Sequence, residues 1–247
     1  MIKTGIWRTA LLFLLFFAFT LAVINVDVQN VAVEDITGTA PSLTTEVGFA
    51  TLNALVHEAM PHNSLFYKLT TLLGYAALLI VAGDGLLGVM QLIRRRSLKK
   101  VDAQLIFLGI FFVLTLLCYV IFEKLPINYR PVLLDAEEGL EASYPSSHTM
   151  LALCVFGAMM VPYPQLFGKK ALPLIRIGAG LLMAVSVAGR ILSGVHWLTD
   201  IAGAVLLSAA LLSLYVSMLQ IHRIHENQQD DDDAIDDGFG DLFRDDK

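Results

Sequence analysis

Hydrophobic residues along this chain occur in long uninterrupted runs, and not at the three- and four-residue intervals of a helix with one buried face. A helix needs about 20 predominantly apolar residues to cross a bilayer, and six runs approach or exceed that length. They extend over Ile6–Ile24, Phe66–Ile93, Ala103–Phe122, Thr149–Phe167, Leu172–Ile191 and Ile201–Ile221. The pattern predicts an all-α integral membrane protein, a bundle of six transmembrane helices.

Composition supports the membrane class. Hydrophobic residues make up 56% of the 247 residues and charged residues only 16%, a balance that is unusual for a soluble domain. Near the C-terminus the pattern changes to "QQDDDDAIDDGFGDLFRDDK", an acidic segment that has little apolar surface to bury. We therefore expect a membrane domain over residues 1–225 and a disordered acidic tail in the cytoplasm over residues 226–247.

The distribution of positive charge predicts the orientation, because short cytoplasmic loops carry the excess of Lys and Arg. Basic residues precede the first run, follow the second in "RRRSLKK" (94–100) and follow the fourth at Lys169 and Lys170, whereas residues 25–65 contain no Lys or Arg. We expect a multi-pass protein of the cell membrane with both termini in the cytoplasm and the loop 25–65 outside. A cleaved signal peptide is the alternative for the first run, although no small-residue cleavage site follows it.

The outer loop 25–65 contains one amphipathic stretch, "TTEVGFATLNALVHEAMP". Its apolar residues fall near one helical face, Thr45 can cap the start and Pro61 can end the helix. An interfacial helix and an irregular loop are both compatible with this pattern.

Neither disulfide nor metal chemistry has support in the sequence. Cys118 and Cys154 both lie within predicted spans, which indicates packing residues. In "HEAMPH" the gap between the histidines is one residue longer than the zinc-binding HExxH helix requires. We therefore expect no metal site and no cofactor.

Polar residues able to carry out chemistry gather in two connections, one between the third and fourth runs and one between the fifth and sixth. The parity of six spans places both connections on the outer face. The residues concerned are Lys124, Arg130, His148, Arg190, His196 and Asp200.

The fourth and sixth predicted helices both begin at this face, and the free N–H groups of helix N-termini bind anions. Ser146 or Ser147 can cap the fourth helix and Ser193 the sixth. With the guanidinium groups of Arg130 and Arg190, these ends form a cluster suited to a phosphate.

His196 and Asp200 are four positions apart, which places them on one face of a helix. The carboxylate can then accept one imidazole N–H and leave the other nitrogen free to attack. For a single His or Arg at a membrane boundary, an interfacial anchor is the alternative interpretation. Six such residues on one face favour an active site.

These residues resemble the three-part signature of the type 2 phosphatidic acid phosphatase superfamily, written K-x6-R-P, P-S-G-H and S-R-x5-H-x3-D. The matching segments are "RP" at 130–131, "PSSH" at 145–148 and "GRILSGVHWLTD" at 189–200. The third is the most specific, because its Arg, His and Asp match in spacing.

Three positions depart from that signature. Lys124 is one residue too close to Arg130, so that Glu123 occupies the position of the family's Lys. Ser147 replaces a Gly and Gly189 replaces a Ser. The histidines, the two arginines and the aspartate are all present, which favours an active enzyme.

The resemblance implies a metal-independent hydrolase that acts through a phosphohistidine. His196 is the implied nucleophile, Asp200 orients its ring and His148 is the general acid. The phosphate-binding residues are expected to be Arg130, Arg190, Ser146, Ser147 and Lys124.

A phosphate site at the outer lipid–water boundary favours a phosphorylated lipid whose tail remains in the bilayer. Phosphatidic acid, phosphatidylglycerophosphate and undecaprenyl pyrophosphate all fit this description, and no nucleic acid is expected as a partner. Two other functions stay open, a catalytically silent lipid-phosphate-binding protein and a small membrane transporter. Asp84, an acid within the second span, is interpreted as structural.

Overall fold

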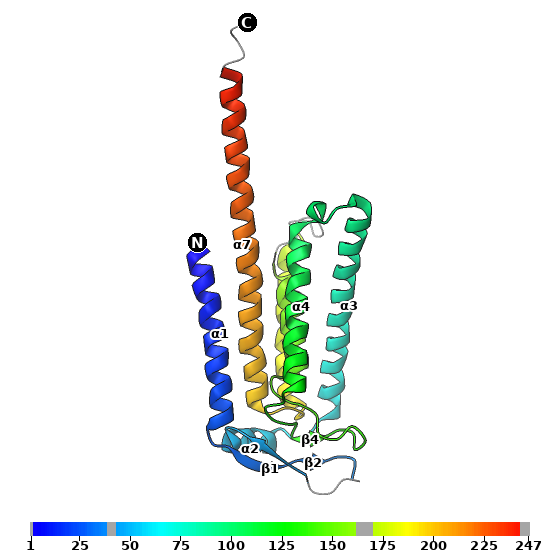
Figure 1. Cartoon of the computed structure of the whole chain (residues 1–247). Coiled ribbons are helices and arrows are strands. Elements are labelled where there is room, and N and C mark those ends of the chain that lie inside the picture. Colours follow the sequence, from blue (N-terminus) through cyan, green and yellow to red (C-terminus); the bar gives the residue numbers. More distant parts are fainter. Residues whose placement is uncertain (1, 39–42, 162–169, 243–247) are drawn as a thin grey trace.

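A computed structural model describes residues 2–38, 43–161 and 170–242, and the chain is predominantly helical (Figure 1). Its helices are α1 Ile2–Asn25, α2 Ala50–Ala59, α3 Ser64–Arg95, the short 3₁₀ helix η1 Leu98–Lys100, α4 Ala103–Lys124, α5 Ser147–Met159, α6 Leu172–Leu192 and α7 Leu198–Leu242. The strands are β1 Gln29–Ala32, β2 Glu34–Asp35, β3 Thr44–Val47 and β4 Val132–Leu133. The all-α prediction is correct for the bundle, and the strands are an addition to it.

Five of the described helices are long and apolar enough to cross a membrane, namely α1, α3, α4, α6 and the first part of α7. The remaining predicted span corresponds to α5, whose 13 described residues make a shorter apolar helix. Part of that predicted span, residues 162–167, lies outside the described residues. Most of α5 is buried because it packs against α3, α4, α6 and α7, so it forms the centre of the bundle.

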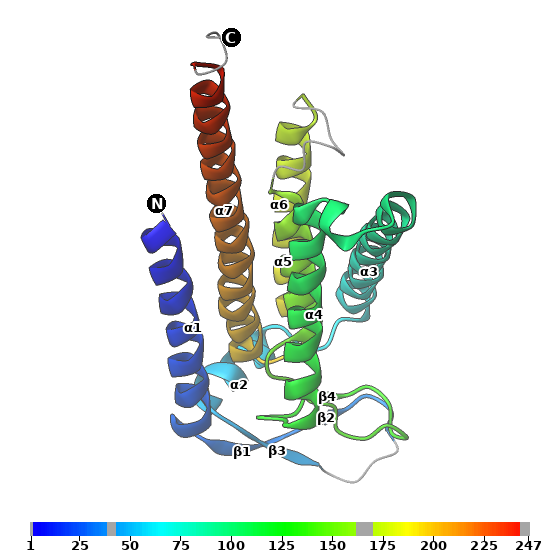
Figure 2. The ribbon, with the colours of Figure 1, turned by 45° about the horizontal axis from the view of Figure 1, so that its top comes forward.

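The two ends of the bundle differ in structure (Figures 1 and 2). The N-terminus, the basic segment 94–100 and the far end of α7 lie at one end, and all four strands lie with α2 at the other. This arrangement agrees with the parity predicted from the sequence, while the side of the membrane on which each end lies stays a prediction.

The loop 25–65 is more ordered than an irregular connection. β1 pairs antiparallel with β3, and β2 pairs parallel with β4, so the loop is attached to the segment that follows Arg130. The predicted helix exists as α2, but Thr45 does not cap it. Thr45 lies in β3, and α2 begins after Phe49, whose φ of 49° interrupts the regular backbone. The Thr45 hydroxyl instead accepts a hydrogen bond from the Tyr129 backbone N–H at 3.1 Å.

The helix α7 continues through Leu242, into the acidic segment, and the disorder expected for residues 226–247 stays a prediction. The physical reason for the continuation is cooperativity: extending an existing helix fixes one residue per hydrogen bond, whereas nucleation is costly. An upstream helix that is buried in the bundle therefore provides a template for the polar segment.

Candidate active site

The sequence motifs meet at the strand-bearing end of the bundle. His148 is the second residue of α5, Arg190 lies near the end of α6, and His196 lies two residues before α7. Arg130 immediately precedes Pro131 and β4. Because α5 and α7 both begin at this end and α6 finishes there, three helices bring the residues together (Figure 2).

The site is removed from solvent. Arg190 and Asp200 are fully buried, and His196 and Arg130 are 5% and 7% exposed. The pKa of His196 is lowered well below its ordinary value, first by burial and then by the charges of Arg130, Arg190 and His148. His196 is therefore neutral near pH 7, which is the state that a nucleophile requires.

His196 and Asp200 are connected through a third residue that the sequence analysis did not identify. The Ser143 hydroxyl lies 2.9 Å from His196 Nδ1 and donates a hydrogen bond to Asp200 Oδ2. The direct distance from His196 Nδ1 to Asp200 Oδ2 is 3.8 Å, too long for a hydrogen bond. The predicted direct hydrogen bond is not made, because α7 begins at Leu198 and His196 is outside the helix.

This relay determines the form of the imidazole. Since the Ser143 proton is given to Asp200, the Ser143 oxygen accepts the proton of His196 Nδ1. The other ring nitrogen, Nε2, then carries a lone pair, and it is buried without a hydrogen-bond partner among the described residues. A free, oriented imidazole lone pair is suited to attack on an electrophile.

Asp200 is held by several donors. Asn128 Nδ2 donates to Oδ1 at 3.0 Å, and the backbone N–H of Trp197 donates to Oδ2 at 2.9 Å. The second bond closes the N-terminus of α7 in the way that an acidic third residue of a helix does. Ser193, predicted to cap this helix, is instead the C-cap residue of α6, and its hydroxyl donates to the Arg190 carbonyl.

Both arginines have N–H donors without a described hydrogen-bond partner. The Arg190 guanidinium lies over the Tyr67 ring at 5.2 Å, and none of its three nitrogens has a hydrogen-bond partner in the described part of the chain. Arg130 forms a 3.0 Å ion pair with Glu141, but its Nε is also without a described partner. Buried cations are costly unless paired, so this pair of guanidiniums is suited to an anion.

Two of the three remaining predicted phosphate ligands lie near the buried residues, and the third does not. Ser146 occupies the cap position of α5, where its hydroxyl bonds with that of Thr149 at 3.0 Å and its N–H donates to the Asp200 carbonyl. Ser147 borders the same cavity as His148. Lys124 is exposed at the end of α4, and no described contact connects it to the buried residues.

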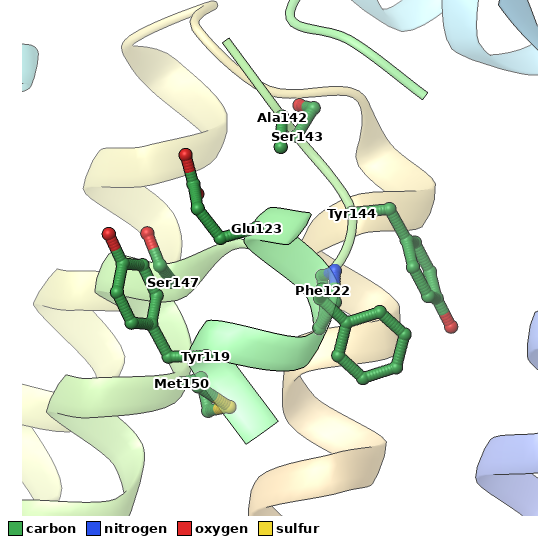
Figure 3. Close-up of a pocket in the computed structure, with 9 residues that line it drawn as sticks. Tyr119, Phe122, Glu123, Ala142, Ser143, Tyr144, Ser147 and Met150 are labelled. Atoms are coloured by element: carbon green, nitrogen blue, oxygen red, sulfur yellow. The ribbon is translucent and has the colours of Figure 1, made fainter. Parts of the chain in front are cut away.

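Glu123, which occupies the position of the family's Lys in the sequence, lies close to Ser143. Figure 3 shows it with Tyr119 and Ser147 around a small cavity of about 10 Å³, which Ser143 and Tyr144 also line. The Tyr144 hydroxyl bonds with that of Thr20 at 2.7 Å, so α1 anchors the segment that carries Ser143 and His148. A carboxylate therefore borders the site at the position of the family's Lys.

A larger cavity of about 540 Å³ extends from the site between α3, α4 and α5. His148 and Ser147 lie at one end of it, and its remaining lining is largely apolar, with residues such as Leu78, Val113 and Leu116. The cavity therefore has polar residues of the site and a largely apolar lining from the surrounding helices.

Sequence reasoning missed Ser143, Asn128, Tyr67 and Glu141. Ser143 and Asn128 lie within a few residues of the motifs "PSSH" and "RP", but only the fold directs their side chains to Asp200. Tyr67 is at the start of a span, where an aromatic residue also serves as an interface anchor. The closeness of Ser143 and Asn128 to the motifs in the sequence is the signal that could have identified them.

A bundle of apolar helices long enough to cross a membrane is typical of an integral membrane protein, and this bundle carries buried imidazoles and guanidiniums at one end. Residues 124–224 match the PAP2 superfamily, which confirms the resemblance predicted from the sequence. A crystal structure of a transmembrane PAP2-type phosphatidylglycerolphosphate phosphatase from Bacillus subtilis is similar in fold, with a TM-score of 0.58 and 17% sequence identity over 87% of this chain and 96% of that chain. No curated protein matches this sequence significantly.

Proposed function

We propose that this protein is a membrane lipid phosphatase that hydrolyses a lipid phosphate or pyrophosphate through a phosphohistidine. The observation that carries the proposal is the His196 ring. Ser143 and Asp200 hold one of its nitrogens, and the other is free beside two guanidiniums with unused donors.

In the proposed reaction, His196 Nε2 attacks phosphorus and the bond to the leaving oxygen breaks. His148 donates a proton to that oxygen. Arg130 and Arg190 bind the equatorial oxygens, where charge gathers in the transition state, and the Ser143–Asp200 pair stabilises the positive charge of the imidazole. Water then attacks the phosphohistidine, with His148 as base, and releases inorganic phosphate.

The apolar cavity supports a lipid substrate. A single acyl or prenyl chain can lie between α3, α4 and α5 while its phosphate reaches His148. Phosphatidic acid, phosphatidylglycerophosphate and undecaprenyl pyrophosphate remain the candidate classes, and the similar Bacillus subtilis protein is a phosphatidylglycerolphosphate phosphatase. We place the site on the extracytoplasmic face, because the basic segment 94–100 is at the opposite end of the bundle.

The test is phosphate release by the purified protein in detergent with a chelator present, using a panel of these lipids. Release by the wild type that is lost in His196→Ala supports the enzyme. Lipid binding without release supports the silent binding protein, and solute flux in vesicles without release supports the transporter.

The pH dependence of kcat/KM gives an independent prediction. The pKa of His196 is lowered by burial and by the neighbouring cations to well below about 6.5, the ordinary value for imidazole, so the nucleophile is still neutral at that pH. We expect activity to be lost as the pH falls through that lowered value. The pKa of His148 is also lowered, to about 3, first by burial and then by the charges of Arg190 and Arg130, so no alkaline limb is assigned to this residue. Rates measured from about pH 4 to about pH 9 check this. An acid limb with its midpoint at or above about pH 6.5 contradicts the lowered pKa of the nucleophile.

A further inference from the structure

The segment of residues 193–200, here called the nucleophile loop, contacts α2 and the turn that follows it on both sides of His196. We propose that α2 positions this loop for turnover, and that Asn53 is the positioning residue through which it acts. The inference rests on the proposed function, because it concerns the rate at which His196 reacts. It assigns a role to a part of the chain that lies outside the segment matched to the superfamily.

Asn53 holds Thr199 at two points. Its Nδ2 donates to the Thr199 hydroxyl at 2.9 Å, and its Oδ1 accepts the Thr199 backbone N–H at 3.2 Å. Nδ2 also donates to the Gly48 carbonyl at 2.8 Å, and the whole side chain is 1% exposed. Asn53 thus satisfies a free N–H in the first turn of α7, one residue before Asp200, from a different helix.

The other side of the nucleophile loop is held by the turn after α2. Ser193 accepts a hydrogen bond from the Asn63 N–H at 3.0 Å. Gly194 has a φ of +66°, and a Cβ at this position would lie only 2.7 Å from the Pro61 carbonyl carbon. The backbones therefore pack directly against one another, and only glycine fits there.

Between these two attachments, aromatic packing covers the centre of the loop. The His57 ring meets the Trp197 ring edge-on with centroids 5.6 Å apart. Asn53, His57 and His196 also line one small cavity. Ser143 thus holds the His196 ring, and α2 holds the loop residues that follow His196.

Position matters because the nucleophile loop has no regular secondary structure of its own at His196. A misplacement of about 1 Å in a reacting group can cost about 100-fold in rate, even when the change lies far from the chemistry. Loss of the Asn53 contacts leaves a buried N–H and a buried hydroxyl unpaired, so the loop is expected to move. The phosphate-binding arginines do not contact Asn53 and should keep their geometry.

The test compares Asn53→Ala with Thr199→Val and Thr199→Ser in the purified full chain. We expect Asn53→Ala to lower kcat by about 10- to 100-fold, while inhibition by inorganic phosphate changes by less than about twofold. Thr199→Val keeps the capped N–H and removes one bond, so a smaller loss is expected. Thr199→Ser restores the hydroxyl and should restore the rate. Asn30→Ala, at an exposed position of β1, is the matched control and should turn over as the wild type does.

The outcomes separate this inference from the proposed function. If the wild type releases no phosphate, the proposed phosphatase function is wrong. A wild type that is active, together with an Asn53→Ala variant of equal kcat, overturns the positioning role alone. Equal losses in kcat and in phosphate binding also overturn it, because they indicate general disruption of the site. If Asn53→Ala fails to fold, the comparison of Thr199→Val with Thr199→Ser decides, since a purely structural role predicts equal kcat in whatever folded fraction remains.

Discussion

Replacing His196 with alanine is expected to lower kcat by at least about 10³-fold, because removal of a nucleophile leaves only the stabilisation provided by its neighbours. The side chain is 5% exposed and supports no span, so the bundle should still assemble. The measurement is phosphate release at saturating lipid phosphate. His225→Ala, at an exposed position in the second half of α7, is the matched control.

Covalent labelling makes this prediction more specific. Substrate labelled in its phosphate should leave a phosphohistidine on the wild type that survives alkali and is lost in acid. The label should be absent from His196→Ala. Near-normal turnover in this variant, or a label that remains on the protein, would assign the nucleophile to another residue.

Replacing Arg190 with methionine is the change with the second largest expected effect. The three guanidinium nitrogens are buried without described partners, and the group lies over the Tyr67 ring. Methionine keeps much of the packing but removes the charge and every donor. We expect kcat/KM to fall by about 10²- to 10³-fold, the range measured for loss of one donor to a transition-state oxygen.

Inhibition by inorganic phosphate distinguishes this role from a structural one. Arg190→Met should weaken it, whereas Arg190→Lys should recover only part of it, because an ammonium cannot bind two oxygens in a fork. Arg176→Met, at an exposed site near the other end of α6, is the control. Unchanged phosphate inhibition in Arg190→Met would contradict an anion-binding role.

The sequence was sufficient to predict a bundle of long apolar helices, because hydropathy acts over whole segments. A run of apolar residues specifies a span without reference to any partner, and the parity of the runs places the two motif-bearing connections at one end. His148, Arg190 and His196 were therefore found correctly as neighbours. The exception is α5, where part of the predicted span lies outside the described residues.

The contacts between these residues could not be predicted in the same way. The relay through Ser143 depends on where α7 begins, and a helix start that is wrong by two residues changes a direct contact into an indirect one. Similarly, Thr45 reads as a helix cap, yet pairing of β3 with β1 determines its conformation. Such features follow from tertiary contacts, which local patterns do not encode.

The attachment of Tyr144 to Thr20 has a consequence for biosynthesis. The hydroxyl of a residue in the first helix holds the segment that carries Ser143, while Asp200 belongs to the last helix of the bundle. A chain emerging from the ribosome thus cannot complete the reactive centre until its final span has been inserted and has met the first. Truncated chains should accumulate as inert proteins, so that hydrolysis begins only after translation has finished.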